Sequence, residues 1–213
     1  AKLALAALAM HARGLGVGTL GELLGERSAH ADGLVRTVMT ALRRNLEPAL
    51  AKGAASRYIV SRDELYVLVD AAIAHCDVRL FEAAIHRGQA LVRTDPAAAA
   101  GAFTAALDVY RGDLLADDTF GGAFEQERER YRRDALAALR FLAARQAEQG
   151  DLEAAEALLR RGTQLAPTDE EPCLALVRHR VAAGQHELAR QAYWDYRKAL
   201  KRLLDVAPSP EFE

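Results

Sequence analysis

Apolar residues in the first 46 positions recur with the period of helices. Residues 1–13 predict one helix, and the glycines that follow favour a helix end because glycine tolerates positive φ. We expect a short extended bridge at Leu15 and Val17, followed by a brief second helix. A third helix is predicted from a cap at Ser28 to about residue 46. Its apolar stripe has offsets of 0, 4, 7 and 11: Val35, Met39, Leu42 and Leu46.

The opposite face of this third helix is polar and basic, and the pattern after it changes. Residues 57–60 and 65–69 are rich in β-branched and aromatic side chains, and the polar residues 61–64 separate them, which predicts a β-hairpin. A short helix, a turn, a longer helix and a hairpin follow the order of a winged helix-turn-helix. We therefore predict such a domain over residues 1–70. Its third helix would fit the major groove of DNA, and its hairpin would reach the adjacent backbone or minor groove.

From Asp77 onward the pattern is helical, with six helices predicted up to residue 206. The segment Gly150–Ala155 recurs as Gly184–Ala189, at a spacing of 34 residues. This spacing is the tetratricopeptide (TPR) period, and its small residues let crossing helices pack closely. Residues 77–213 are therefore predicted to form an all-α, TPR-like array with a groove for peptides or partner helices. The fold class is mainly α, with a small β-hairpin in the first domain.

Composition and charge change this picture little. The 213 residues carry a net charge of −2 and are 51% hydrophobic, which suits a globular chain. Residues 1–70 hold nine Lys or Arg against seven Asp or Glu, so this part is mildly basic and the remainder is acidic. Cys76 and Cys173 form neither a disulfide framework nor a metal-ligand spacing. No apolar run reaches the roughly 18 residues of a membrane span, so we expect a cytoplasmic protein with no membrane partner.

The sequence lacks the residue patterns that enzyme chemistry requires. It has no phosphate loop, no dinucleotide fingerprint, no Gly-x-Ser-x-Gly and no histidine pair at metal-ligand spacing. Asp113, Asp117 and Asp118 lack the spacing of a calcium loop and its closing glutamate. We expect no enzyme activity, no cofactor and no metal. Gly112 is expected to supply a turn conformation, and Asp113 to cap the following segment.

Four motifs resemble those of one family of bacterial regulators. The third helix carries Leu42-Arg43 within its stripe, the hairpin has Leu65–Leu68, and the second domain opens with Asp77–Phe81. The most specific motif is Ala106–Leu115, which matches Ala-Leu-x-x-Tyr-x-Gly-Asp-Leu-Leu throughout. The chain therefore resembles the Streptomyces antibiotic regulatory proteins (SARP), in which a winged helix precedes a bacterial transcriptional activator domain (BTAD). The resemblance implies a DNA-binding transcriptional activator.

Three departures from that family bear on function. The β-strands that usually precede the winged helix are missing, so we expect the chain to begin inside a longer protein. The wing turn lacks the family's glycine, and Ala41 replaces a basic residue common just before Leu-Arg. These two changes favour an alternative, a TPR-like interaction scaffold whose winged helix no longer binds DNA. A second alternative is an effector-sensing fragment of a larger multidomain protein.

The candidate DNA-binding residues lie on the third helix and in the hairpin. Arginine can pair with guanine edges or phosphate, and threonine can contact base edges or phosphate. Arg43 is the strongest candidate because it matches the family's arginine, and a phosphate contact is favoured over a base contact. The full set is Arg36, Thr37, Thr40, Arg43, Arg44, Arg57 and Arg62.

The last predicted helix carries a candidate partner site. Tyr193, Trp194 and Tyr196 form an aromatic cluster there, for which core packing is the first interpretation and a partner hot spot the second.

Residues 125–133 form a charge run, which we expect to be a helix face with ion pairs one turn apart. The predicted function is a regulator that binds paired promoter repeats in double-stranded DNA. Its second domain would mediate self-association or contact a partner such as RNA polymerase.

Overall fold

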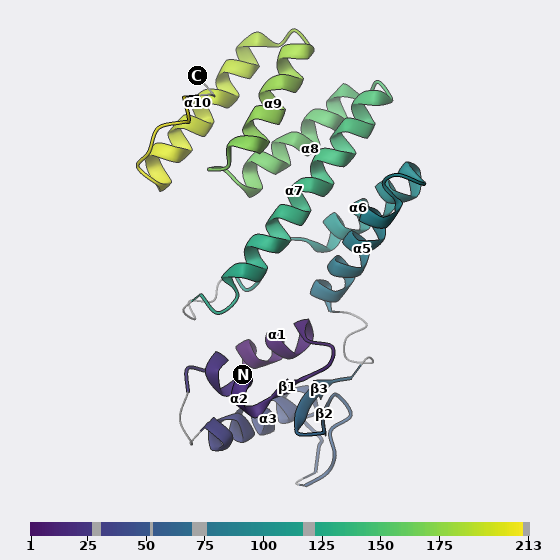
Figure 1. Cartoon of the computed structure of the whole chain (residues 1–213), viewed down its shortest axis with the longest axis vertical. Coiled ribbons are helices and arrows are strands. Elements are labelled where there is room, and N and C mark those ends of the chain that lie inside the picture. The colour runs from purple at the N-terminus through teal and green to yellow at the C-terminus, as the bar shows by residue number, and fades with distance from the viewer. Residues whose placement is uncertain (27–30, 52, 70–75, 117–121, 211–213) are drawn as a thin grey trace. The chain divides into compact units, whose positions relative to one another are not determined.

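The computed structural model describes residues 1–26, 31–51, 53–69, 76–116 and 122–210. The chain divides into two compact units, Ala1–Glu82 with Asp118–Ala123, and Ala83–Asp117 with Phe124–Glu213. Figure 1 labels the helices and strands of each unit. The helix cap predicted at Ser28 lies outside the described residues, as do Asp117 and Asp118.

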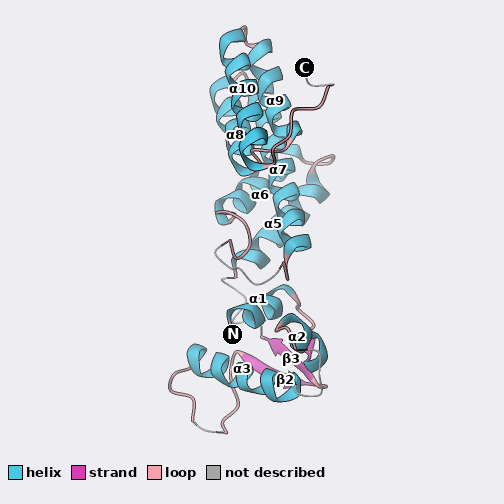
Figure 2. Ribbon diagram, turned by 90° about the vertical axis from the view of Figure 1, so that its left-hand side faces the viewer, coloured by secondary structure: helices cyan, strands magenta, loops and turns pink. Residues whose placement is uncertain are grey.

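Helices and a small sheet make up the described part of the first unit. The helices are α1 (Lys2–Met10), α2 (Val17–Leu23) and α3 (Ala31–Leu46), and the strands are β1 (Leu15–Gly16), β2 (Ile59–Arg62) and β3 (Leu65–Leu68). Helix α2 packs against α3, and α1 packs against α2 and β3. Among the described residues, strands occur only in this unit, as Figure 2 shows.

The sheet is antiparallel with the strand order β1-β3-β2, so the predicted hairpin gains a third strand. Strand β1 pairs with β3 through Leu15 and Tyr66, where the sequence predicted only an extended bridge. Gly14 precedes this strand with a φ of 86°, and a Cβ atom on it would lie 2.6 Å from the Tyr66 carbonyl oxygen. Any side chain at this position would therefore push β1 away from β3. Val17 does not continue the strand but begins α2.

The turn between β2 and β3 is shorter than the sequence predicted. Only Asp63 and Glu64 form it, with φ of 45° and 63°, while the residues on either side are paired in the ladder. Two residues at positive φ give the turn geometry that matches the twist of paired strands. An aspartate and a glutamate therefore adopt the conformation that glycine adopts at lower cost. The hairpin therefore forms without the glycine that the SARP family has at the wing turn.

The apolar stripe of α3 supplies much of the core of the first unit. Val35, Met39 and Leu42 are buried as predicted, whereas Leu46 at the end of the helix is 36% exposed. The other large side chains of this unit that are fully buried come from α1, α2 and β2: Leu8, Leu20 and Ile59. Burial of this stripe fixes which face of α3 is turned to solvent.

The described part of the second unit is helical. Its helices are α5 (Asp77–Leu91), α6 (Pro96–Val109), α7 (Glu125–Glu148), α8 (Leu152–Leu165), α9 (Glu170–Ala182) and α10 (His186–Leu203), with the boundary between units inside α5. From α6 onward each helix packs against the next one along the chain, as Figure 1 shows. Gly88 on α5 allows close packing with α6, because a Cβ atom there would lie 2.5 Å from the Phe103 ring.

The 34-residue sequence repeat falls on equivalent positions of two helices. Helices α8 and α10 each begin two residues after a glycine at positive φ, Gly150 at 84° and Gly184 at 73°. The repeated alanines, Ala155 and Ala189, are both buried. Their small side chains let the neighbouring helices approach closely, as the repeat predicted.

Candidate nucleic-acid interface

Most of the predicted contact residues on α3 lie on its solvent-facing side. The exposed ones are Arg36, Thr37, Thr40 and Arg44. Arg36 forms an ion pair with Asp32 one turn earlier, with 2.9 Å between Nη2 and Oδ2 and both side chains exposed. Exposed pairs of this kind contribute about 0–1 kcal/mol, so Arg36 can exchange its partner for a phosphate at low cost.

The two threonines use their hydroxyl protons within the helix. Thr37 donates to the carbonyl oxygen of Gly33 at 2.9 Å, and Thr40 donates to that of Arg36 at 2.8 Å. A hydroxyl in this arrangement can still accept a hydrogen bond, but its donor is occupied. Phosphate oxygens only accept, so these threonines suit the amino groups of adenine or cytosine better than a phosphate.

Arg43 joins α3 to the hairpin. Its Nε donates to the carbonyl oxygen of Ile59 at 3.0 Å, and its guanidinium lies 5.7 Å from the ring centroid of Tyr66. Both partners belong to the sheet, so this side chain sets the position of the hairpin against α3. The residue predicted as the strongest DNA contact therefore also holds the fold together, a role that the sequence did not reveal.

A buried carboxylate holds the connection between α3 and β2. Glu47 is only 8% exposed and accepts hydrogen bonds from the Ser56 hydroxyl, from the Arg57 backbone N–H at 3.0 Å and from Arg57 Nε at 3.3 Å. These bonds, the one from Ser56 first, lower the pKa of the Glu47 carboxyl. The Arg57 side chain remains 82% exposed at the foot of the hairpin. No sequence pattern singled out Glu47 or Ser56.

A cleft of about 860 Å³ lies between α3 and the tip of the hairpin. Its charged lining residues are three acidic and two basic side chains: Asp32, Asp63, Glu64, Arg36 and Arg43. This balance makes the cleft weakly acidic and disfavours a phosphate inside it. Arg44, Arg57 and Arg62 are exposed and lie outside its lining, where a DNA backbone would meet less repulsion.

The most specific sequence motif of the second unit builds structure. The Tyr110 hydroxyl donates to Asp113 Oδ1 at 3.1 Å, and Arg132 Nη2 donates to Asp113 Oδ2 at 2.6 Å. Burial first, and then the Asp113 carboxylate, raise the pKa of Tyr110. Arg128 and Arg161 donate to backbone carbonyl groups of the same motif. Asp113 therefore ties the loop after α6 to the charge run of α7, where the sequence had predicted a cap.

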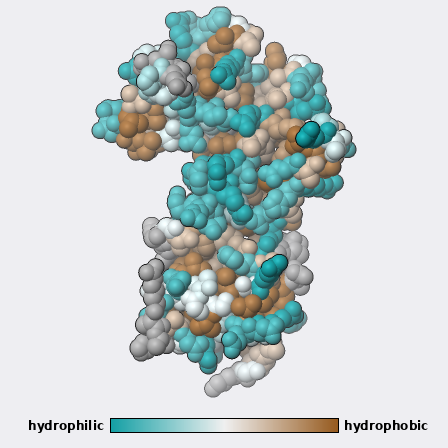
Figure 3. Space-filling view, viewed as in Figure 1, coloured by the Kyte–Doolittle hydropathy of each residue, from teal (hydrophilic) through white to brown (hydrophobic). Residues whose placement is uncertain are grey.

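The aromatic residues of α10 divide into a buried part and an exposed part. Tyr196 is buried in a core cluster with Cys173. Trp194 is 49% exposed, with the Arg197 guanidinium 5.0 Å from its ring centroid and Tyr193 in edge contact at 6.0 Å. On the face drawn in Figure 3, hydrophobic side chains lie among hydrophilic ones on both units.

The described residues show neither a membrane-spanning helix nor a metal-binding cluster. None of the described helices combines the length and the apolar character that crossing a membrane requires. The described residues contain no group of three or more His, Cys, Asp or Glu side chains placed to hold a metal ion.

Comparison with known proteins places the chain in a family. Residues 76–213 match the family described as "Bacterial transcriptional activator domain", and this match covers more than half of the chain. The chain therefore belongs to the BTAD family, a family of transcriptional activators and not of enzymes. No curated protein matches the sequence.

Among solved structures, the chain is similar over most of its length to the following one. It is described as "Mycobacterium tuberculosis EmbR in complex with low affinity phosphopeptide", with a TM-score of 0.69 and 22% sequence identity. The similarity covers 99% of this chain and 56% of that one, so this chain spans little more than half of that protein's length. At this identity the likeness shows the fold alone.

Proposed function

We propose that this chain is a DNA-binding transcriptional activator of the SARP type. Its first unit would bind promoter DNA as a winged helix, through the exposed face of α3 and through the β2–β3 hairpin. The observation that carries the proposal is the bond from Arg43 to Ile59, because it couples the two elements that hold the exposed arginines. The fold shared with EmbR and membership of the BTAD family support the same function.

We propose residues 1–70 as the winged-helix domain and residues 77–213 as a TPR-like activator domain. The 34-residue repeat, with equivalent glycines and buried alanines, supports this array. The second domain would mediate self-association or contact a partner such as RNA polymerase. Trp194, which is exposed, and Tyr193, which is half-buried, would contribute to that contact.

The test is binding of the chain to random DNA duplexes at several salt concentrations. Each phosphate contact makes the slope of log affinity against log salt steeper by about 0.9. The four exposed candidate arginines, Arg36, Arg44, Arg57 and Arg62, therefore predict a slope of about −4. The double variant Arg44→Ala, Arg62→Ala is expected to reduce this slope by about 2. The control is Arg178→Ala with Arg202→Ala, which removes the same charge from exposed positions of the second unit.

The acidic side chains in the cleft between α3 and the hairpin favour a second candidate function, an interaction scaffold that does not bind DNA. Such a scaffold would bind duplexes weakly, and both double variants would behave alike. Enrichment of a repeated half-site, lost only in the α3 and hairpin variant, would exclude it.

A further inference from the structure

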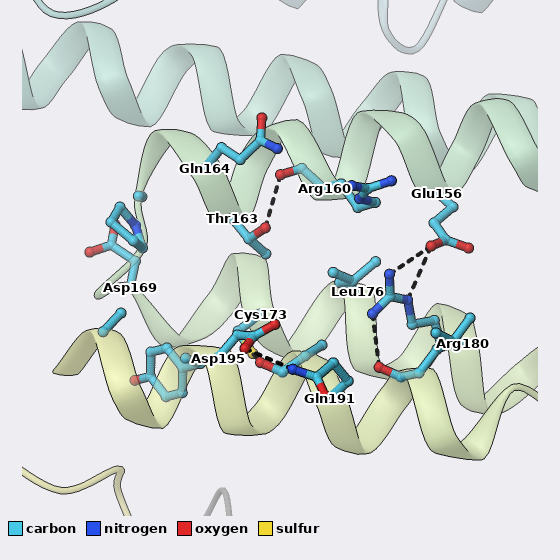
Figure 4. Close-up of a pocket in the computed structure, with 16 residues that line it drawn as sticks. Glu156, Arg160, Thr163, Gln164, Asp169, Cys173, Leu176, Arg180, Gln191 and Asp195 are labelled. Carbon is cyan, nitrogen blue, oxygen red and sulfur yellow. Dashed lines mark hydrogen bonds and ion pairs between the residues drawn. The ribbon is translucent and has the colours of Figure 1, made fainter. Parts of the chain in front are cut away.

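A groove runs between α8, α9 and α10 of the second unit, with a volume of about 600 Å³. Figure 4 shows Glu156 and Arg180 at one end and Asp169 at the other, with Cys173 between them. Its wall along α8 extends from Glu156 to Ala166, the residue that caps the end of the helix, which at a rise of 1.5 Å per residue is about 15 Å. An extended peptide of about four or five residues has this length.

The ion pair at one end of the groove is structural. Arg180 Nη2 donates to Glu156 Oε1 at 2.7 Å, and Arg180 Nη1 donates to the Leu188 carbonyl oxygen at 2.8 Å. Its Nε also donates to Glu156, and both side chains are largely buried. The pair closes this end of the groove and adds no net charge to it.

Two further carboxylates line the groove, those of Asp169 and Asp195. Asp169 is the N-cap residue of α9, yet its side chain makes no capping hydrogen bond, unlike most aspartates at this position. Asp195 on α10 accepts a hydrogen bond from Gln191 Nε2 at 2.9 Å. Within the described residues neither carboxylate forms an ion pair. A cationic group in the groove would be the first to pair with them.

Nearby carboxylates contribute to raising the pKa values of two buried side chains of the groove, Cys173 and Tyr196. Burial first, and then Asp195 and Glu170, raise the pKa of the Cys173 thiol to about 11. Burial first, and then Glu170, Cys173 and Asp169 in that order, raise the pKa of Tyr196. The α9 and α10 side of the groove therefore presents two carboxylates, and Cys173, Leu176 and Ala192 line its apolar floor. The opposite wall differs, because α8 places Arg160 there, as Figure 4 shows.

We propose that this groove binds a short extended peptide with a lysine or arginine side chain directed at Asp195 and Asp169. Successive side chains of an extended peptide point to opposite sides, so the residue next to the basic one would face Arg160. An acidic or amide side chain is favoured at that neighbouring position. Apolar burial on the floor supplies affinity, while the charged walls select the sequence.

A peptide site here gives the second unit the partner role proposed above. DNA binding by α3 can hold or fail without it, because the groove belongs wholly to the second unit. The two functions are therefore tested by separate experiments.

The test is a selection of random hexapeptides on the immobilised full chain, followed by fluorescence anisotropy with individual selected peptides. We expect lysine or arginine to be enriched at one position. The double variant Asp169→Asn, Asp195→Asn should weaken binding of those peptides at least tenfold. Glu187→Gln is the control, because this exposed glutamate lies on α10 outside the groove and should leave the affinity unchanged.

A gain-of-affinity variant keeps the test decisive even if the double variant does not fold. Gln191→Glu adds a carboxylate to the same wall and should tighten binding of lysine peptides about threefold, which corresponds to roughly half of the 1.4 kcal/mol of a tenfold change. The proposal is overturned if the selected peptides show no enrichment of basic residues. It is also overturned if folded variants and the control bind those peptides equally.

Discussion

Replacement of Arg43 by alanine is expected to loosen the hairpin from α3 before any DNA is added. The side chain contributes a hydrogen bond of 3.0 Å from Nε to the Ile59 carbonyl oxygen and a cation–π contact of 5.7 Å with Tyr66. A hydrogen bond from a charged donor contributes about 1.5 kcal/mol, and a partly exposed cation–π contact about 0.5 kcal/mol. The loss in free energy that holds the hairpin on α3 is therefore about 2 kcal/mol.

Native-state hydrogen exchange at the backbone amides of β2 and β3 measures this effect. A loss of about 2 kcal/mol corresponds to roughly thirtyfold faster exchange, since each 1.4 kcal/mol is tenfold. Arg44→Ala is the matched control, because it removes the same charge from the next residue, which is exposed. Arg43→Lys should exchange almost as fast as Arg43→Ala, since lysine has no Nε–H in this position. Exchange rates that stay the same in Arg43→Ala would refute the structural role of this arginine.

Three further substitutions test local features of the fold. Glu64→Gly should raise the thermal midpoint of the first unit, because glycine adopts a φ of 63° without the steric strain that glutamate has there. The net gain in the free energy of unfolding is about 0.5 kcal/mol after the entropy cost of glycine, and a lower midpoint would contradict this. The Glu47 pKa is lowered in the fold, so its stabilisation is present above the ordinary value of 4.5 and is lost as pH falls through the lowered pKa. Urea midpoints measured down to acidic pH should therefore fall more steeply for the native chain than for Glu47→Gln, and parallel curves would argue against this. Gly88→Ala should destabilise the packing of α5 on α6 by about 1–2 kcal/mol, because the new Cβ atom would lie 2.5 Å from the Phe103 ring. This loss should exceed the gain from the better helix propensity of alanine. An unchanged urea midpoint would show that the two helices move apart freely.

The sequence predicted those features that depend on neighbouring residues. The stripe of α3 was recognisable because burial of Val35 and Met39 follows from helical spacing. The repeat at Gly150 and Gly184 was recognisable because a positive φ after a helix favours glycine. Strand β1 was harder to predict, since it has only two residues and depends on pairing with β3, about 50 residues further along the chain.

The sequence predicted which residues of the candidate DNA site are exposed on α3, but not the contacts that hold the site together. Helical spacing placed Arg36 and Arg44 on the exposed face of α3, but it could not show that Arg43 bonds to a strand 16 residues away. Buried Glu47 was not predicted either, because its partners come from a loop without a recognisable pattern. Such contacts between distant parts of the chain become visible only when the fold brings them together.

The sequence alone could have distinguished the buried aromatic residues of α10 from the exposed ones. Residues two apart on a helix do not share a face, so Trp194 and Tyr196 could not both be buried on the same side. The groove beside them could not be predicted, because α8, α9 and α10 each contribute one part of its charge pattern.

DNA binding by the first unit is measured by the salt dependence of its affinity for DNA duplexes. The chain is expected to show a slope of log affinity against log salt of about −4, reduced by about 2 in Arg44→Ala, Arg62→Ala. The Arg178→Ala, Arg202→Ala control should keep the full slope. A slope near zero for the chain, or the same reduction in both double variants, would contradict DNA binding through α3 and the hairpin.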